Sequence, residues 1–171
     1  YFDNFRILIK TLEKKATRFA IHQTLFVHVK DSVVFNVPVE VITSQSHLHK
    51  DTACLISVGG DGTLLDTLTL VRDTGIPVLG INTGRLGFLS AVSTGEIEQA
   101  AMSLISGNYS LDKRSILNLC APEGLFGNIN YALNELTVLK RDNSTMISIS
   151  AYVDDLFLNT YWADGLIVST P

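Results

Sequence analysis

Hydrophobic and polar residues follow one another along the first fifty positions with the spacing of short helices and strands. Apolar residues on one face predict a helix over residues 5–12, and a second helix is expected over residues 23–33. A loop with one short strand is expected over residues 37–44, because Pro38 has no N–H to donate to a ladder. Residues 1–49 match no diagnostic motif, and the candidate catalytic and binding residues lie further along the chain.

The clearest pattern is a strand, a helix and a second strand between residues 52 and 81. A nearly continuous apolar run over residues 53–58 has the length and character of a parallel strand covered on both faces. The apolar residues that follow share one helical stripe: Leu64, Leu65, Leu68 and Val71. Gly75 and Pro77 are expected to end this helix, and residues 78–81 supply the next apolar strand. This unit predicts a right-handed parallel crossover.

A fourth helix is predicted from signals at both of its ends. Ser93 and Glu96 have the spacing of a capping box, in which two side chains satisfy backbone N–H groups at the start of a helix. Gly107 follows the last apolar residue, where a glycine commonly ends a helix.

Beyond about residue 110 the period changes from helical to alternating, which is typical of half-buried strands. The alternation is clearest over residues 147–153, and Asp154-Asp155 then predicts a hairpin turn. Further short strands are expected at residues 116–121, 131–140 and 156–162.

Two architectures therefore follow one another, and we predict one domain over residues 1–108 and a second over residues 109–171. A length of 171 residues fits one domain plus part of another. The chain starts without Met and stops just after a strand, so we expect it to be a fragment.

Composition and net charge limit the classes of molecule that the chain is expected to bind. The net charge of -4 provides no general attraction to nucleic acid or to an anionic membrane, so neither is expected as a partner. Cys54 and Cys120 both lie in apolar runs, which predicts buried structural thiols rather than a disulfide. No apolar stretch has the length of a membrane span and no signal pattern opens the chain, which predicts a cytoplasmic protein.

The glycine-rich stretch Gly59-Gly60-Asp61-Gly62-Thr63 directly follows the predicted strand. A two-residue hairpin at Asp61-Gly62 would be followed by alternation, but a helical pattern follows instead. One remaining interpretation is that Asp61 caps this helix. The other is that bare glycine amides let phosphates approach, while Asp61 accepts a proton or organises a cation. Parallel sheets bind ligands at the carboxyl ends of their strands, where this loop is expected.

Four motifs follow one another along the chain: Gly59-Gly60-Asp61-Gly62-Thr63, Asn82-Thr83-Gly84-x-Leu86-Gly87-Phe88, Asn134-Glu135, and Asp164-Gly165-Leu166-Ile167-Val168-Ser169-Thr170-Pro171. In this order and spacing they resemble the motifs of the NAD kinase family. The first motif also resembles diacylglycerol and sphingosine kinases and, in variant form, phosphofructokinases. The resemblance implies an α/β Rossmann-like domain followed by the start of an all-β, β-sandwich-like domain. It also implies that the family's first strand and the rest of its β domain are absent here.

The resemblance implies transfer of the ATP γ-phosphoryl group to the adenosine-ribose 2′-hydroxyl of NAD, giving NADP. Asp61 would accept the proton of that hydroxyl and contact the substrate together with Gly62. The phosphate loop would comprise Gly59, Gly60, Gly62 and Thr63. Mg²⁺ or another divalent cation would accompany ATP, its protein ligands being unknown. A homodimer or homotetramer is expected by the same resemblance.

The other residues to which the resemblance gives a substrate contact are Phe88, Asn134, Glu135, Thr145 and Asp164. From the residues alone, Asn134-Glu135 also fits a polar pair on an edge strand, Asp164 fits a turn, and Phe88 fits a core position. Two other functions stay open, a lipid kinase of the diacylglycerol or sphingosine kinase type and a nucleotide-sensing module without catalysis.

Overall fold

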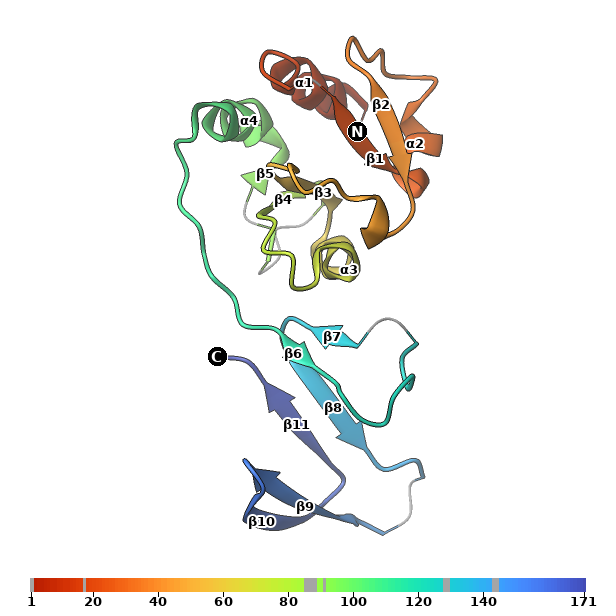
Figure 1. The fold of residues 1–171 in the computed structure, drawn as a ribbon, viewed down its shortest axis with the longest axis vertical. Helices are drawn as coiled ribbons and strands as arrows, with labels where there is room; N and C mark the ends of the chain where they lie inside the picture. Colours follow the sequence, from red (N-terminus) through yellow and green to blue (C-terminus); the bar gives the residue numbers. More distant parts are fainter. Residues whose placement is uncertain (1, 17, 85–88, 91, 128–129, 143–144) are drawn as a thin grey trace. The chain divides into compact units, whose positions relative to one another are not determined.

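The computed structural model describes residues 2–16, 18–84, 89–90, 92–127, 130–142 and 145–171 (Figure 1). The chain forms two compact units, Tyr1–Asp112 and Lys113–Pro171. Each unit is described by itself below. Within the described ranges, no helix is both long and apolar enough to cross a bilayer.

The first unit combines helices with parallel strands, as the sequence predicts. Its α-helices and strands are α1 (Phe2–Leu12), β1 (Phe19–His22), α2 (Gln23–Val29), β2 (Val39–Ile42), β3 (Leu55–Gly59), α3 (Asp61–Val71), β4 (Val78–Asn82), β5 (Val92–Ser93) and α4 (Ile97–Ser106). Short 3-10 turns lie at Gln45–His47 and Thr94–Glu96. Strands β1 and β2 pair in parallel, and β3, β4 and β5 form a second parallel sheet. The predicted strand-helix-strand unit with parallel strands is confirmed.

Two predicted helix ends are wrong. Helix α2 ends at Val29 rather than at residue 33, and a turn follows in which the Ser32 N–H donates to the Val29 carbonyl three residues back. Helix α3 ends at Val71, before Gly75, because Arg72 leaves the helix with a φ of 46°. Strand β5 was not predicted, since two residues are too short to show a period.

The predicted capping box is confirmed. The Glu96 carboxylate accepts the Ser93 backbone N–H at 3.0 Å and the Ser93 hydroxyl at 2.5 Å. These two hydrogen bonds, the hydroxyl contributing more, lower the pKa of Glu96. Gly107 ends α4 in the left-handed conformation with a φ of 73°, as expected for a glycine at that position.

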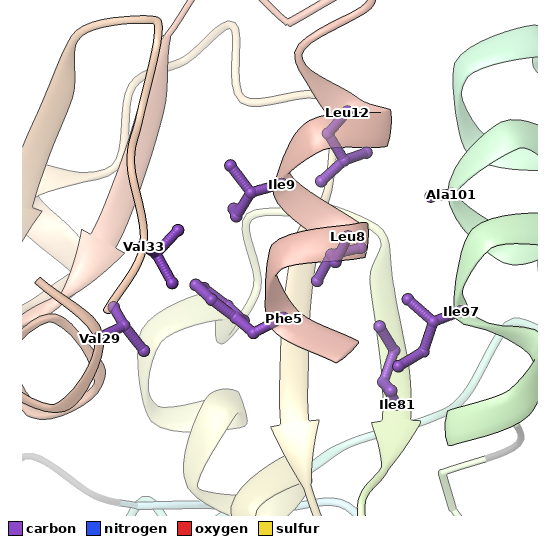
Figure 2. Close-up of a cluster of buried hydrophobic side chains, with 9 residues drawn as sticks. All are labelled: Phe5, Leu8, Ile9, Leu12, Val29, Val33, Ile81, Ile97 and Ala101. Carbon is purple, nitrogen blue, oxygen red and sulfur yellow. The ribbon is translucent and has the colours of Figure 1, made fainter. Parts of the chain in front are cut away.

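The hydrophobic core of the first unit joins α1 to α4 and to the end of β4 (Figure 2). Its members are Phe5, Leu8, Ile9, Leu12, Val29, Val33, Ile81, Ile97 and Ala101. The side chain of Ile81 is fully buried and directly precedes Asn82, the last residue of β4. The core therefore fixes the end of β4, where the second motif, a glycine-rich loop, begins at Asn82.

The second unit consists of antiparallel strand pairs. Its strands are β6 (Leu117–Asn118), β7 (Tyr131–Ala132), β8 (Glu135–Leu139), β9 (Ile147–Val153), β10 (Leu156–Ala163) and β11 (Gly165–Ser169). The pairs are β6 with β7, β8 with β11, and β9 with β10. Asp154 and Asp155 join β9 to β10 with φ values of 49° and 62°, so the predicted hairpin turn is confirmed.

Three sequence predictions for the second unit need correction. The strand expected over residues 116–121 is only Leu117–Asn118. The strand expected over residues 131–140 is divided between β7 and β8, because β7 pairs with β6 whereas β8 pairs with β11. Cys120, expected to be buried, is exposed, although Cys54 is partly buried and both cysteines are free.

Candidate functional site

Asp61 is the first residue of α3 and directly follows the end of β3 and Gly60. Its Oδ1 atom accepts the backbone N–H groups of Leu89 and Ser90, each at 3.2 Å. The N-cap residue of α3 is Gly60, so the interpretation of Asp61 as the helix cap is wrong. The half-buried carboxylate instead joins α3 to a segment almost thirty residues further along the chain.

The first glycine-rich loop and the one that begins at Asn82 leave the same edge of the sheet. Gly59 and Asn82 are register partners at the carboxyl ends of β3 and β4. The Thr83 N–H donates to the Gly59 carbonyl at 3.2 Å, and the Gly84 N–H donates to Asn82 Oδ1 at 2.8 Å. These bonds fix the start of the second loop beside the first. Its continuation, Arg85 to Phe88, lies outside the described residues, and so does the predicted contact of Phe88.

The glycines of the first loop differ in what surrounds them. A Cβ atom on Gly59 would collide with the Thr63 side chain, so this position needs a glycine for packing. A Cβ atom on Gly60 or Gly62 would meet no atom within 4 Å. Packing therefore does not explain Gly60 and Gly62, whose exposed backbone lies at the start of α3. The first N–H groups of a helix lack intrahelical partners and carry positive potential, which favours an anionic group such as phosphate.

In the second unit the third and fourth motifs lie side by side. Glu135, the first residue of β8, is the register partner of Ser169. The Thr170 N–H donates to the Asn134 carbonyl at 2.9 Å, and the Thr170 hydroxyl donates to the Leu133 carbonyl at 2.8 Å. Asn134 and Glu135 are both exposed. In the part of the chain that the structure describes, this sheet contains only β8 and β11, so the edge-strand interpretation stays open.

Asp164 lies at the opposite end of the same strand pair. Its carboxylate forms an ion pair with Lys140 at 2.6 Å, and its carbonyl accepts the Lys140 N–H at 2.9 Å. Five residue steps along β8, about 17 Å, separate the Asp164–Lys140 pair from Glu135. The structure therefore does not bring Asp164 and Glu135 into one contact. Thr145 is exposed, two residues before β9.

A cavity of about 550 Å³ lies elsewhere in the first unit. Residues from α1, β1 and β3 line it, among them Leu8, Ile21 and Ile56, and Cys54 just before β3 also contributes. Its described lining includes none of the candidate site residues. Burial in this region raises the pKa of the Cys54 thiol to about 11, an effect that a hydrogen bond to the Leu79 backbone partly opposes.

The donors available to a metal ion are few. Among the described residues, no group of three or more His, Cys, Asp or Glu side chains is placed to hold a metal. Mg²⁺ in nucleotide sites is commonly held by substrate phosphates, water and one or two carboxylates rather than by an all-protein cage.

Sequence reasoning missed three contributions to these sites. Two come from Leu89 and Ser90, which act through backbone N–H groups that leave no signal in the residue type. Asn82 belongs to the second motif, and its burial at the end of an apolar strand is a further signal. The third contribution is the ion pair of Lys140 with Asp164. No local pattern indicates this pair, because the two residues lie 24 positions apart in the sequence.

The family model described as the ATP-NAD kinase N-terminal domain matches residues 10–109. An NAD kinase of Cytophaga hutchinsonii is 43% identical over 165 residues, which are 96% of this chain and 56% of that protein. An NAD kinase of Bacteroides fragilis is 40% identical over 164 residues, again 96% and 56%. The chain thus spans about half the length of these relatives.

Two solved structures share the fold. The crystal structure of yeast NADH kinase complexed with NADH has a TM-score of 0.79 and 21% identity, covering 99% of this chain and 53% of that one. The crystal structure of an NAD kinase from Archaeoglobus fulgidus in complex with ATP has a TM-score of 0.59 and 26% identity, covering 89% and 60%.

Proposed function

The chain belongs to the ATP-NAD kinase family, and from this premise we propose that the complete protein transfers the γ-phosphoryl group of ATP to the adenosine-ribose 2′-hydroxyl of NAD. The observation that carries the proposal is the placement of Asp61. Its carboxylate is held by two backbone amides beside a loop of bare glycines, at the carboxyl end of a parallel sheet. Such an edge is where ligands of parallel α/β sheets bind.

In the proposed reaction Asp61 accepts the proton of the 2′-hydroxyl as the oxygen attacks the γ-phosphorus. The new bond joins the ribose oxygen to phosphorus, the bond between phosphorus and the β,γ-bridging oxygen breaks, and ADP leaves. Phosphoryl transfer depends mainly on the orientation of the nucleophile and on stabilisation of charge. The amides of Leu89 and Ser90 orient the Asp61 carboxylate, and a general base contributes roughly 10²- to 10⁴-fold to the rate.

The phosphate groups are proposed to lie over Gly59, Gly60, Gly62 and Thr63. Support comes from the open space above Gly60 and Gly62 and from the N-terminal turn of α3. The Archaeoglobus fulgidus relative was crystallised with ATP, which supports ATP as the donor. Mg²⁺ would be bound mainly through the ATP phosphates and would neutralise their charge.

Binding of NAD is proposed to involve Asn134, Glu135, Thr145 and Asp164, together with Gly62 and Phe88. Glu135 accepts hydrogen bonds from ribose hydroxyls, and Asn134 supplies a paired donor and acceptor. Asp164 contacts the nicotinamide end. The separation of about 17 Å between Asp164 and Glu135 along this strand pair supports contacts to different parts of an extended dinucleotide.

The architecture follows the same premise. We propose that residues 1–108 form a Rossmann-like domain and that residues 109–171 begin a β-sandwich-like domain. A cytoplasmic location and a homodimer or homotetramer are also proposed on the family's pattern.

An assay of the complete chain with ATP and Mg²⁺ tests the proposed reaction. NAD, NADH and diacylglycerol are offered separately, and the phosphorylated products are identified by mass spectrometry. We expect phosphorylation of NAD, with NADP as product. Phosphorylation of diacylglycerol without NADP formation would identify a lipid kinase, and ATP and NAD binding without turnover would identify a nucleotide-sensing module; either result would overturn the proposal.

A further inference from the structure

Gly80, in the middle of β4, lies in one of the most crowded positions of the first unit. The residue is buried, and a Cβ atom built on it would lie 2.5 Å from Leu64 Cδ1. The same atom would lie 3.0 Å from both the Cα and the Oγ of Ser90. A side chain at position 80 would therefore press on α3 and on the segment that holds Asp61.

The two crowding contacts differ in how easily they can relax. Leu64 Cδ1 is the far end of a flexible side chain, which can rotate away. Ser90 Cα belongs to the backbone, and Ser90 is only 1% exposed, so it can yield only if its segment moves. A Cβ atom at position 80 would push this backbone by a few tenths of an ångström.

The hydrogen bonds on Asp61 have little tolerance for such a movement. Both amides lie 3.2 Å from Asp61 Oδ1, at the long end of the usual range for N–H···O hydrogen bonds. A displacement of the Ser90 backbone by a few tenths of an ångström would lengthen and weaken these bonds. The Asp61 carboxylate would then be held less firmly in its present orientation.

We propose that Gly80 is a positioning residue for phosphoryl transfer: its lack of a side chain lets Ser90 approach the sheet and thereby places the amides that orient Asp61. This inference rests on the proposed role of Asp61 as the base. Gly80 lies outside all four recognised motifs and touches neither substrate in the proposed reaction.

The test compares Gly80→Ala with Gly95→Ala in the complete chain. A Cβ atom on Gly95 meets nothing within 4 Å, so this variant controls for a glycine-to-alanine change in the same unit. We expect Gly80→Ala to lower kcat roughly tenfold or more, with the KM values for NAD and ATP changed by less than about twofold, because positioning acts on the reacting geometry. Amide hydrogen exchange at Leu89 and Ser90 should become faster, and Gly95→Ala should behave like the wild type.

A double variant separates positioning from simple packing. Adding Leu64→Ala to Gly80→Ala removes the contact with α3 but leaves the contact with the Ser90 backbone. We expect kcat to stay low relative to Leu64→Ala alone. Recovery of kcat to the level of Leu64→Ala would assign the defect to packing of α3 and would overturn the inference.

Two further outcomes distinguish a failure of the positioning role of Gly80 from a failure of the proposed reaction. Faster exchange at Leu89 and Ser90 with an unchanged kcat would overturn the positioning role while leaving the reaction in place. Full activity of Asp61→Asn would remove the base role instead. If Gly80→Ala does not fold, Ser90→Pro deletes the amide donor itself, and a kcat equal to that of the wild type would overturn the inference.

Discussion

The Asp61 carboxylate accepts the backbone N–H of Ser90, a residue 29 positions further along the chain. Together with the neighbouring Leu89 N–H, this contact connects the start of α3 to the segment that follows the second glycine-rich loop. An aspartate that could have served only as a helix cap is thereby held in one orientation by a distant part of the fold.

Replacement of Asp61 by Asn should lower kcat for NADP formation roughly a hundredfold or more, because an amide cannot accept the proton of the ribose hydroxyl. The dissociation constant of NAD should change little, since the residue keeps its size and its carbonyl acceptor. Steady-state kinetics and calorimetric titration of the complete chain measure the two effects.

Asp66 is the matched control for this change, because it is an exposed aspartate on the same helix. Asp66→Asn should retain wild-type kcat and NAD affinity. Equal losses in the two variants would point to a charge effect of the helix rather than to proton transfer at Asp61.

Replacement of Gly59 by Ala should destabilise the first loop, because the new methyl group collides with Thr63. Overpacking of this kind costs about 1–3 kcal/mol of the free energy of unfolding. Urea denaturation of the complete chain measures the loss, and Gly95→Ala, whose Cβ meets open space, should cause none. Equal stability of the two variants would show that Thr63 moves aside at no cost.

Replacement of Leu8 by Ala should lower the free energy of unfolding by about 2–5 kcal/mol, because Leu8 is 3% exposed and packs in the core between α1 and α4. Ile7, the preceding residue of the same helix, is 43% exposed. Ile7→Ala should change stability by less than about 0.5 kcal/mol. A similar loss in both variants would contradict the orientation of α1.

The two cysteines should differ in reactivity with iodoacetamide. Burial raises the pKa of the Cys54 thiol from 9.0 to about 11, so little thiolate forms at pH 8, whereas Cys120 is exposed. Peptide mass spectrometry at pH 8 should find Cys120 alkylated at least about tenfold faster. Preferential labelling of Cys54 in the folded protein would contradict the burial of its thiol.

The raised pKa also predicts how stability changes in alkali. The unfolded thiol ionises near pH 9 and the folded thiol near pH 11, so the unfolded state releases its proton first. The contribution of Cys54 to stability is complete below pH 9 and is lost as the pH rises to 11. A Cys54→Ala variant should show a smaller decrease in the free energy of unfolding across this interval.

Much of the local structure follows from short stretches of sequence. The capping box of Ser93 and Glu96, the glycine at the end of α4 and the turn at Asp154-Asp155 each depend on a few neighbouring residues, and all three were predicted correctly. The ends of α2 and α3 were not; at α3, Arg72 adopts a positive φ that its residue type does not indicate. The division between β7 and β8 depends on their pairing with different strands, β6 and β11.

The sequence by itself determined the periods of the main elements, the order of the four motifs and the position of Asp61 directly after a buried strand. These properties are encoded by neighbouring residues, whose spacing decides whether a helix or a strand buries its apolar face. Only the tertiary structure decided that the amides of Leu89 and Ser90 hold Asp61, that a side chain at position 80 would crowd Leu64 and Ser90, and that Glu135 and Asp164 lie at opposite ends of one strand pair. Such contacts depend on the packing of distant segments and on backbone groups that every residue carries. They therefore cannot be predicted from the residue types.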